Sequence, residues 1–228
     1  MLLIDGYWAH DLNYERSEGK HPKTVELCYT KNLYHRPDFI VDDFSSFCSI
    51  DSNTKTICGA KVTIGVAYVW EIKRKKNNFS YRLDCGCQYI WVNSKIKKIE
   101  NMMWGILLKE LTTKGMLNIN ERTLIVVDSD KDELLKFNSG QIFSTDCEFN
   151  LLPQNFKFAY TSAERGGGVF HFIIKACDTI ASFILNELEN NGNYKCADEI
   201  KRAFEQIDTD SRVFKFFEEN KNNRDKRS

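Results

Sequence analysis

The sequence predicts an α/β fold built on a mixed five-stranded sheet, with three antiparallel strands, further strands added in parallel, and helices on its flanks. Three observations predict it. Strand-like segments rich in β-branched and aromatic residues follow one another between 38 and 92, joined by short polar links. The apolar period then becomes helical, and strands and helices alternate to about residue 190. The resulting order, β-β-β-α-β-α-β-α, is typical of a mixed sheet with helices packed on its faces.

The first three elements are predicted to form an antiparallel meander. "DFIVDDFSSFCSI" (38–50) is apolar and β-branched, which indicates a strand. "AKVTIGVAYVWEIK" (60–73) and "FSYRLDCGCQYIWV" (79–92) have the same character, and "RKKNN" (74–78) between them indicates a turn. Short connections of this kind join neighbouring antiparallel strands.

The second half of the chain alternates between helix and strand. After Asn93-Ser94, a possible cap, apolar residues recur at helical spacing, and Gly115 can end the helix. The segment 123–127 indicates a strand buried on both faces, and 156–161 a further strand. We expect helices around 131–137, over 169–190, and as one or two amphipathic helices within 195–219. Residues 1–36 show no clear period, so we expect an N-terminal extension (1–36), a main domain (37–190) and a C-terminal helical extension with a basic tail (191–228).

Composition narrows the class of protein. With 42% hydrophobic and 13% aromatic residues, the chain can bury a sizeable core. No apolar run approaches the roughly 18 residues that span a bilayer, and the N-terminus lacks the features of a signal peptide. Eight cysteines include one close pair, Cys85 and Cys87, and no C-x-x-C motif, so a zinc site is poorly supported. We expect a reduced, cytoplasmic protein without a membrane partner.

The charge balance limits the kind of nucleic-acid binding. Thirty-two basic and 32 acidic residues cancel, whereas broad nonspecific binding usually shows a basic excess. Local basic patches remain at 71–78, 94–98 and 220–228. Each is also typical of a solvated turn, a helix start or a frayed terminus.

Two helical carboxylates occupy positions where an apolar residue is expected. Glu100 lies four residues after Ile96 and three before Met103, on the apolar face of its helix. Asp178 lies four residues after Ile174 and three before Ala181, again on the buried stripe. An unpaired buried carboxylate costs several kcal/mol, so each is expected to have a cationic partner or a metal.

Two more acids follow apolar strands. Asp128 ends the run Thr123–Val127, and either Asp42 or Asp43 ends the run before it. Acids here can cap the next helix and favour the positive end of its dipole, and helical acids can pair with lysines such as Lys175. Alternatively, the four carboxylates converge on one place. An all-oxygen site suits Mg²⁺, and paired metals can activate water and stabilise the leaving oxygen in phosphodiester cleavage.

The order of these segments resembles ribonuclease H, whose acids follow one another as Asp, Glu, Asp and Asp. "FIVDDFSS" resembles the first strand of that family, which typically reads Y-T-D-G-S, and "KIENMMWGILLKEL" resembles the helix that carries its Glu. "IVVDSDKDELL" resembles the strand that ends in T-D-S. "CDTIA" (177–181) is similar to the C-D-x-L-A of the last helix. The resemblance spans roughly 38–188.

The resemblance implies a metal-dependent endonuclease that cuts the RNA strand of RNA–DNA hybrids. It implies that Asp42 or Asp43, Glu100, Asp128 and Asp178 are catalytic and hold Mg²⁺ or Mn²⁺, with two ions present when substrate is bound. Arg74, Lys95, Lys97, Lys98 and Arg165 are candidate contacts to the nucleic acid, and 1–36 or 191–228 could bind a protein partner. The family's loop histidine is missing from "SAERGGG" (162–168). The alternative is a non-catalytic module of the same fold that binds nucleic acid or protein.

Overall fold

A computed structural model describes the backbone of residues 6–8, 12–13, 24–28, 41–75, 78–92, 99–128, 155–161 and 169–222. Side chains are described for 41–74, 79–92, 103–128, 155–157 and 169–220. The predicted helix around 131–137 lies outside these residues.

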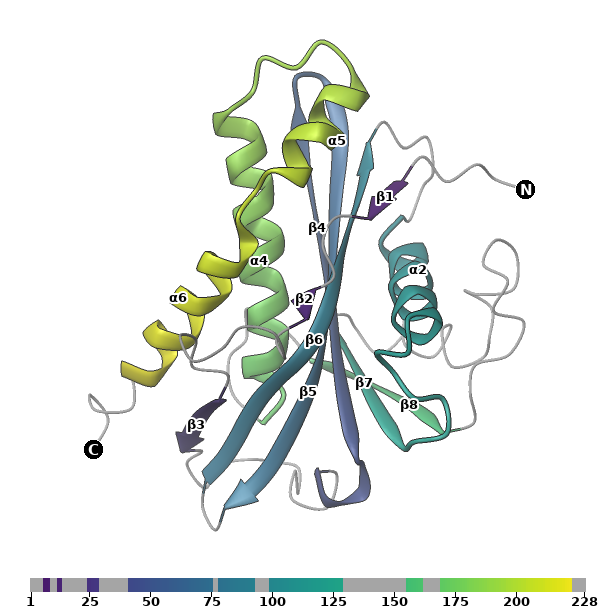
Figure 1. Cartoon of the computed structure of the whole chain (residues 1–228), viewed down its shortest axis with the longest axis vertical. Coiled ribbons are helices and arrows are strands. Elements are labelled where there is room, and N and C mark those ends of the chain that lie inside the picture. Colours follow the sequence, from purple (N-terminus) through teal and green to yellow (C-terminus); the bar gives the residue numbers. More distant parts are fainter. Residues whose placement is uncertain are drawn as a thin grey trace.

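Within the residues that the structure describes, five long strands and four helices make up the main body (Figure 1). The strands are β4 (Ser46–Ile57), β5 (Ala60–Lys75), β6 (Asn78–Val92), β7 (Thr123–Asp128) and β8 (Phe156–Thr161). The helices are α2 (Ile99–Thr113), α4 (His171–Asn190), α5 (Ala197–Glu205) and α6 (Thr209–Asn222). None of the helices in the described part of the chain is long and apolar enough to span a bilayer.

The sheet has the predicted mixed topology. Its long strands lie in the order β6-β5-β4-β7-β8. The first three pair antiparallel, while β7 pairs in parallel with both β4 and β8. The predicted fold class, a mixed α/β sheet flanked by helices, is therefore confirmed.

Three short strands near the N-terminus were not predicted. They are β1 (Gly6–Trp8), β2 (Leu12–Asn13) and β3 (Thr24–Cys28), and all pair antiparallel with β6. β1 and β2 are too short to show a period, and β3 alternates only over its five residues, with Val25 and Leu27 between polar neighbours, so no long pattern marks these strands in the sequence.

Two hydrophobic clusters lie on opposite faces of the sheet. Helix α4, with α5 and α6, covers one face, and α2 covers the other (Figure 1). On β7, Leu124 and Val126 belong to the α4-side cluster, whereas Ile125 and Val127 belong to the α2-side cluster. This double burial explains the uninterrupted apolar run of β7, since a strand covered on both faces needs no polar alternation.

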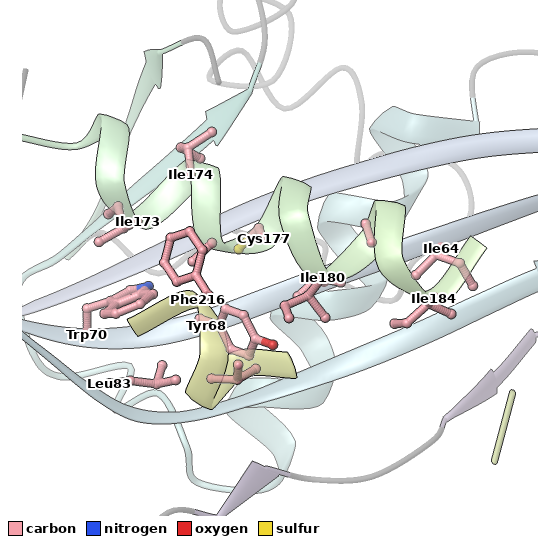
Figure 2. Close-up of a cluster of buried hydrophobic side chains, with 14 of the residues drawn as sticks. Ile64, Tyr68, Trp70, Leu83, Ile173, Ile174, Cys177, Ile180, Ile184 and Phe216 are labelled. Carbon is pink, nitrogen blue, oxygen red and sulfur yellow. The ribbon is translucent and has the colours of Figure 1, made fainter. Parts of the chain in front are cut away.

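Aromatic packing holds the C-terminal helices on the α4 side. Phe216 and Phe217 of α6 are buried, and Phe217 stacks on Trp70 of β5 with ring centroids 5.9 Å apart. The ring centroids of Phe172 on α4 and Phe216 lie 5.2 Å apart. Figure 2 shows Phe216 among Trp70, Tyr68 and the apolar side chains of α4. Residues of α5 and α6 thus share one core with α4 and the sheet.

Helix α2 packs closely on the sheet at a glycine. A Cβ on Gly65 of β5 would lie 2.3 Å from Met103 Cγ, so this position admits no side chain unless Met103 or the helix moves. Met103, Leu107 and Leu111 are fully buried, as their helical spacing predicts. Gly115 has φ +70°, the left-handed conformation expected where the helix ends.

The first strand begins later than predicted. Residues 41–43 form a helical turn, and β4 starts at Ser46, where the backbone N–H groups of Ser45 and Ser46 donate to Arg122 O. Val41 is buried, while Asp42 and Asp43 are exposed. Two adjacent aspartates disfavour a strand, and the turn leaves both in water. The strand continues to Ile57 through the polar segment 51–56, which the sequence analysis did not assign to a strand.

Candidate functional site

Two aspartates lie side by side where β4 and β7 are paired. The last parallel pair in the register joins Ile50 to Val127, so the next residues along the two strands are Asp51 and Asp128. Strand alternation places both on the α4 side, because Phe47 and Val126 belong to the α4-side cluster. Asp51 is 6% exposed, and Asp128 is half-buried.

A third carboxylate comes from the helix that covers this face. Asn53, two residues beyond Asp51 on β4, donates from Nδ2 to Asp178 Oδ1 (3.1 Å) and to Ser182 Oγ (2.9 Å). The other carboxylate oxygen of Asp178 forms an ion pair with Lys175, one turn earlier on α4. We call Asp51, Asp128 and Asp178 the acid cluster.

The electrostatics of the cluster act mainly on Asp51. Burial raises the pKa of its carboxyl well above the usual 3.8, and the neighbouring Asp128 and Asp178 raise it further. The Ser52 backbone N–H, 2.7 Å from Asp51 Oδ1, and the charge of Lys175 oppose the rise. A carboxyl that is buried beside two others and only partly offset is a feature of functional sites more often than of an inert core.

A buried polar chain fixes α4 on β4 next to the cluster. Trp70 Nε1 donates to Ser49 Oγ (2.8 Å), and Ser49 Oγ lies 3.1 Å from the sulfur of Cys177. Burial raises the pKa of the Cys177 thiol well above its usual 9.0, so the group stays neutral and acts as a packing and hydrogen-bonding residue. Since Cys177 immediately precedes Asp178, these contacts set the position of that aspartate over the sheet. Figure 2 shows Cys177 pointing from α4 toward the sheet.

The predicted glutamate comes from the opposite face. Glu100 is the second residue of α2, and only its backbone is described. Met103, three residues later, packs on Gly65, which is in register with Ser52 of β4. The first turn of α2 therefore starts level with the residue after Asp51, at the same end of the sheet as the acid cluster.

Asp42 and Asp43 are not brought to this place. They precede β4, whose first residue, Ser46, pairs with Thr123 at the start of β7. Asp128 lies at the other end of β7, roughly 16 Å away along the strand. Asp42 instead forms an ion pair with Arg74 (3.4 Å), and its side chain is 61% exposed. The aspartate of β4 that meets Asp128 is Asp51, which lies inside that strand, and the placement of Asp42 or Asp43 beside Asp128 was wrong.

Asp51 has a sequence signal of its own, which resembles that of Asp128. A branched apolar residue followed by Asp-Ser occurs twice, as Ile50-Asp51-Ser52 and as Val127-Asp128-Ser129. Ile50 and Val127 are the last pair in the parallel register of β4 and β7. The polar residues after Asp51 suggested a loop, whereas they form one arm of a long hairpin with β5.

Of the residues predicted to contact nucleic acid, the structure describes only Arg74. Arg74 lies eight residues along β5 from Val66, the partner of Asp51, which is roughly 26 Å of strand. Its partner there is Asp42. Lys95, Lys97, Lys98 and Arg165 lie outside the described residues, as does the loop 162–168.

The donor types of the acid cluster suit a hard divalent cation, because all three are carboxylates. Among the described side chains, no three His, Cys, Asp or Glu groups are close enough together to hold a metal ion as they stand. Asp178 is engaged by Lys175 and Asn53. The donor chemistry fits a divalent ion, whereas binding one would require the carboxylates to come closer together and Asp178 to part from Lys175.

Comparisons with known proteins assign no family. No protein-family model matches the chain, and a search of curated proteins finds no match. Among solved structures, the NurA nuclease from Sulfolobus solfataricus aligns over 79% of this chain and 49% of its own, with 11% sequence identity and a TM-score of 0.27. The chain thus spans about half the length of that nuclease, and a likeness at this level assigns neither fold nor activity.

Proposed function

We propose that the protein is a divalent-metal-dependent nuclease that hydrolyses phosphodiesters at the acid cluster. One observation carries the proposal: the buried carboxyl of Asp51 lies where β4, β7 and α4 meet, between two further carboxylates. Burying such groups together costs free energy unless cations offset them. A site retained at that cost suggests a function that needs the charge.

Mg²⁺ or Mn²⁺ is the cofactor that this proposal assigns. Asp51, Asp128 and Asp178 would hold it, joined by Glu100 from the first turn of α2. When bound, such ions would activate a water nucleophile and stabilise the leaving oxygen, with two ions in the site once substrate is bound. Asn53, which also donates to Ser182 Oγ, orients the Asp178 carboxylate, and the chain from Trp70 through Ser49 to Cys177 holds its helix in place.

The finer proposal is ribonuclease H-type cleavage of the RNA strand of RNA–DNA hybrids. It rests on the sequence resemblance together with the strand order and the helix order. A 2′-hydroxyl would let the site distinguish RNA from DNA. We also propose a cytoplasmic location, because the cysteines whose side chains are described are free thiols.

The test is cleavage of end-labelled RNA–DNA hybrid, duplex RNA and single strands with Mg²⁺, Mn²⁺ or chelator. Asp51→Asn is expected to lower the cleavage rate by at least about a hundredfold, since even the loss of a group supporting a metal ligand costs about 10–100-fold. Asp42→Asn is the matched control. It removes an acid of the same type from the exposed turn that precedes β4, and it should leave the rate unchanged.

The outcomes separate three assignments. Metal-dependent cutting that is lost in Asp51→Asn and kept in Asp42→Asn supports the site described above. The reverse pattern supports the sequence-based assignment of Asp42. Binding of a substrate without cutting, by folded protein with metal present, supports the non-catalytic binding module.

A further inference from the structure

Lys175 is the cation that contacts the acid cluster from α4. Its ammonium pairs with one oxygen of Asp178, while Asn53 holds the other oxygen from the sheet. The Lys175 side chain is 44% exposed and that of Asp178 is 22% exposed. The lysine can therefore leave toward solvent without releasing the aspartate, which keeps its contact with β4.

The influence of Lys175 extends beyond this one pair. Its charge also acts on Asp51, the buried member of the cluster, where it opposes the effect of the other two acids. Three carboxylates and one ammonium leave an excess of negative charge when all are ionised. A divalent cation would balance that excess better than the lysine does, because it carries twice the charge and can contact several carboxylates at once.

Resting on the proposed function, we infer that Lys175 is an exchangeable counter-ion of the acid cluster. In the metal-free protein its ammonium neutralises Asp178. A divalent cation displaces it, and the freed ammonium then contacts a phosphate of the nucleic-acid substrate. A lysine suits this role because it is a compact charge on a flexible four-carbon chain and binds phosphate as a point charge.

The chain contains a matched pair that separates this role from ordinary surface pairing. Lys55, two residues beyond Asn53 on the same face of β4, pairs with Glu189 of α4 (2.5 Å) and is 36% exposed. Both pairs therefore involve a half-exposed lysine and an acid of α4. The two lysines differ in that Lys175 pairs with a member of the acid cluster and Lys55 does not.

The first measurement is Mn²⁺ binding, read from the loss of the free-ion signal in electron paramagnetic resonance. Lys175→Gln is expected to bind Mn²⁺ about three- to tenfold more tightly than the wild type, because a competing charge is gone. Lys175→Arg keeps the charge and Lys55→Gln leaves the cluster unchanged, so both should bind as the wild type does. Thermal melting of the metal-free variants checks that all are folded.

The second measurement is the affinity for a fluorescently labelled RNA–DNA hybrid, with Ca²⁺ in place of Mg²⁺. Lys175→Gln should bind the hybrid about three- to tenfold more weakly than Lys55→Gln does, since one phosphate contact is lost. If Lys175 served packing alone, its replacement would not strengthen the binding of Mn²⁺ and weaken the binding of the hybrid at the same time.

The two results also distinguish the inference from the proposed function. If Lys175→Gln and Lys55→Gln show the same Mn²⁺ affinity, or the same hybrid affinity, the exchange inference is overturned while the nuclease proposal stands. If the folded wild type binds neither Mn²⁺ nor the hybrid, the proposed function fails, and the exchange inference fails with it.

Discussion

Replacing Asp51 by asparagine is expected to make the metal-free protein more stable at neutral and alkaline pH. The substitution keeps the size of the side chain, and its Oδ1 can still accept the hydrogen bond from the Ser52 backbone N–H. It removes the negative charge that burial, Asp128 and Asp178 disfavour. A gain in stability on removing the carboxylate that we propose to be catalytic is the expected result where function and stability conflict.

The direction of this change in unfolding free energy follows from the raised pKa of Asp51. Between its usual 3.8 in the unfolded chain and its higher value in the folded protein, the folded state holds a proton that the unfolded state has released. The free energy of unfolding of the wild type therefore falls as pH rises through this window and levels off above the folded pKa. Asparagine has no such titration, so the difference between variant and wild type is small at acidic pH and grows through the same window.

The size of the plateau follows from the burial of Asp51, which is 6% exposed. Mutational data put the cost of burying a poorly compensated polar group at about 1–3 kcal/mol. We therefore expect the unfolding free energy of Asp51→Asn to exceed that of the wild type by an amount in this range above the folded pKa. For a domain of this size each kcal/mol raises the melting temperature by about 2–4 °C. Excess Mg²⁺ should narrow the difference in unfolding free energy between the variant and the wild type, because a ligand at a hundred times its Kd stabilises the protein that binds it by about 2.7 kcal/mol.

Urea denaturation across a pH series, with chelator and then with Mg²⁺, measures the difference in unfolding free energy between Asp51→Asn and the wild type. Asp42→Asn is the control, since its side chain is 61% exposed and should change the unfolding free energy by less than about 0.5 kcal/mol. A less stable Asp51→Asn protein in chelator at alkaline pH would refute the reasoning. So would a stability difference that does not depend on pH.

Three further predictions concern the frame around the site. Gly65→Ala should cost about 1–3 kcal/mol of unfolding free energy in urea, because its Cβ would lie 2.3 Å from Met103 Cγ; an unchanged denaturation midpoint would contradict this packing. Phe217→Ala removes a buried ring stacked on Trp70 and should cost about 3–5 kcal/mol within a single unfolding transition. A separate early transition would instead mean that α6 unfolds independently. Trp70→Phe deletes the donor to Ser49 Oγ and should lower stability by about 1–2 kcal/mol in thermal melting, and no loss would show that this hydrogen bond contributes nothing.

Much of the fold could be predicted because periodicity is a local property. The helical spacing of Met103, Leu107 and Leu111 identified α2, and the β-branched runs identified β5 and β6. The same argument found the aspartate at the end of β7 and the unusual acid on α4. Each of these inferences needs only neighbours in sequence.

The first aspartate could not be chosen in the same way. Asp42, Asp43 and Asp51 all follow or interrupt apolar residues within one short stretch. The ion pair between Lys175 and Asp178, weighed as an alternative to a metal, is present in the structure, so the two explanations do not exclude one another. Local pattern cannot rank such candidates, because it contains no information on which residues face one another.

The sequence by itself determined the longer strands and the helices of the described part of the chain, their order, and the unusual carboxylates on otherwise apolar segments, since side-chain period and propensity act over a few residues. The tertiary structure decided which carboxylates meet. The parallel register of β4 and β7 pairs the end of one apolar run with the end of the other, and a shift of one residue would turn Asp51 to the opposite face. The packing of α4 through Cys177 and Ser49 then brings Asp178 over the same place. Contacts between residues 77 positions apart, as between β4 and β7, or 128 apart, as between Ser49 and Cys177, are set by register and packing, which no local pattern specifies.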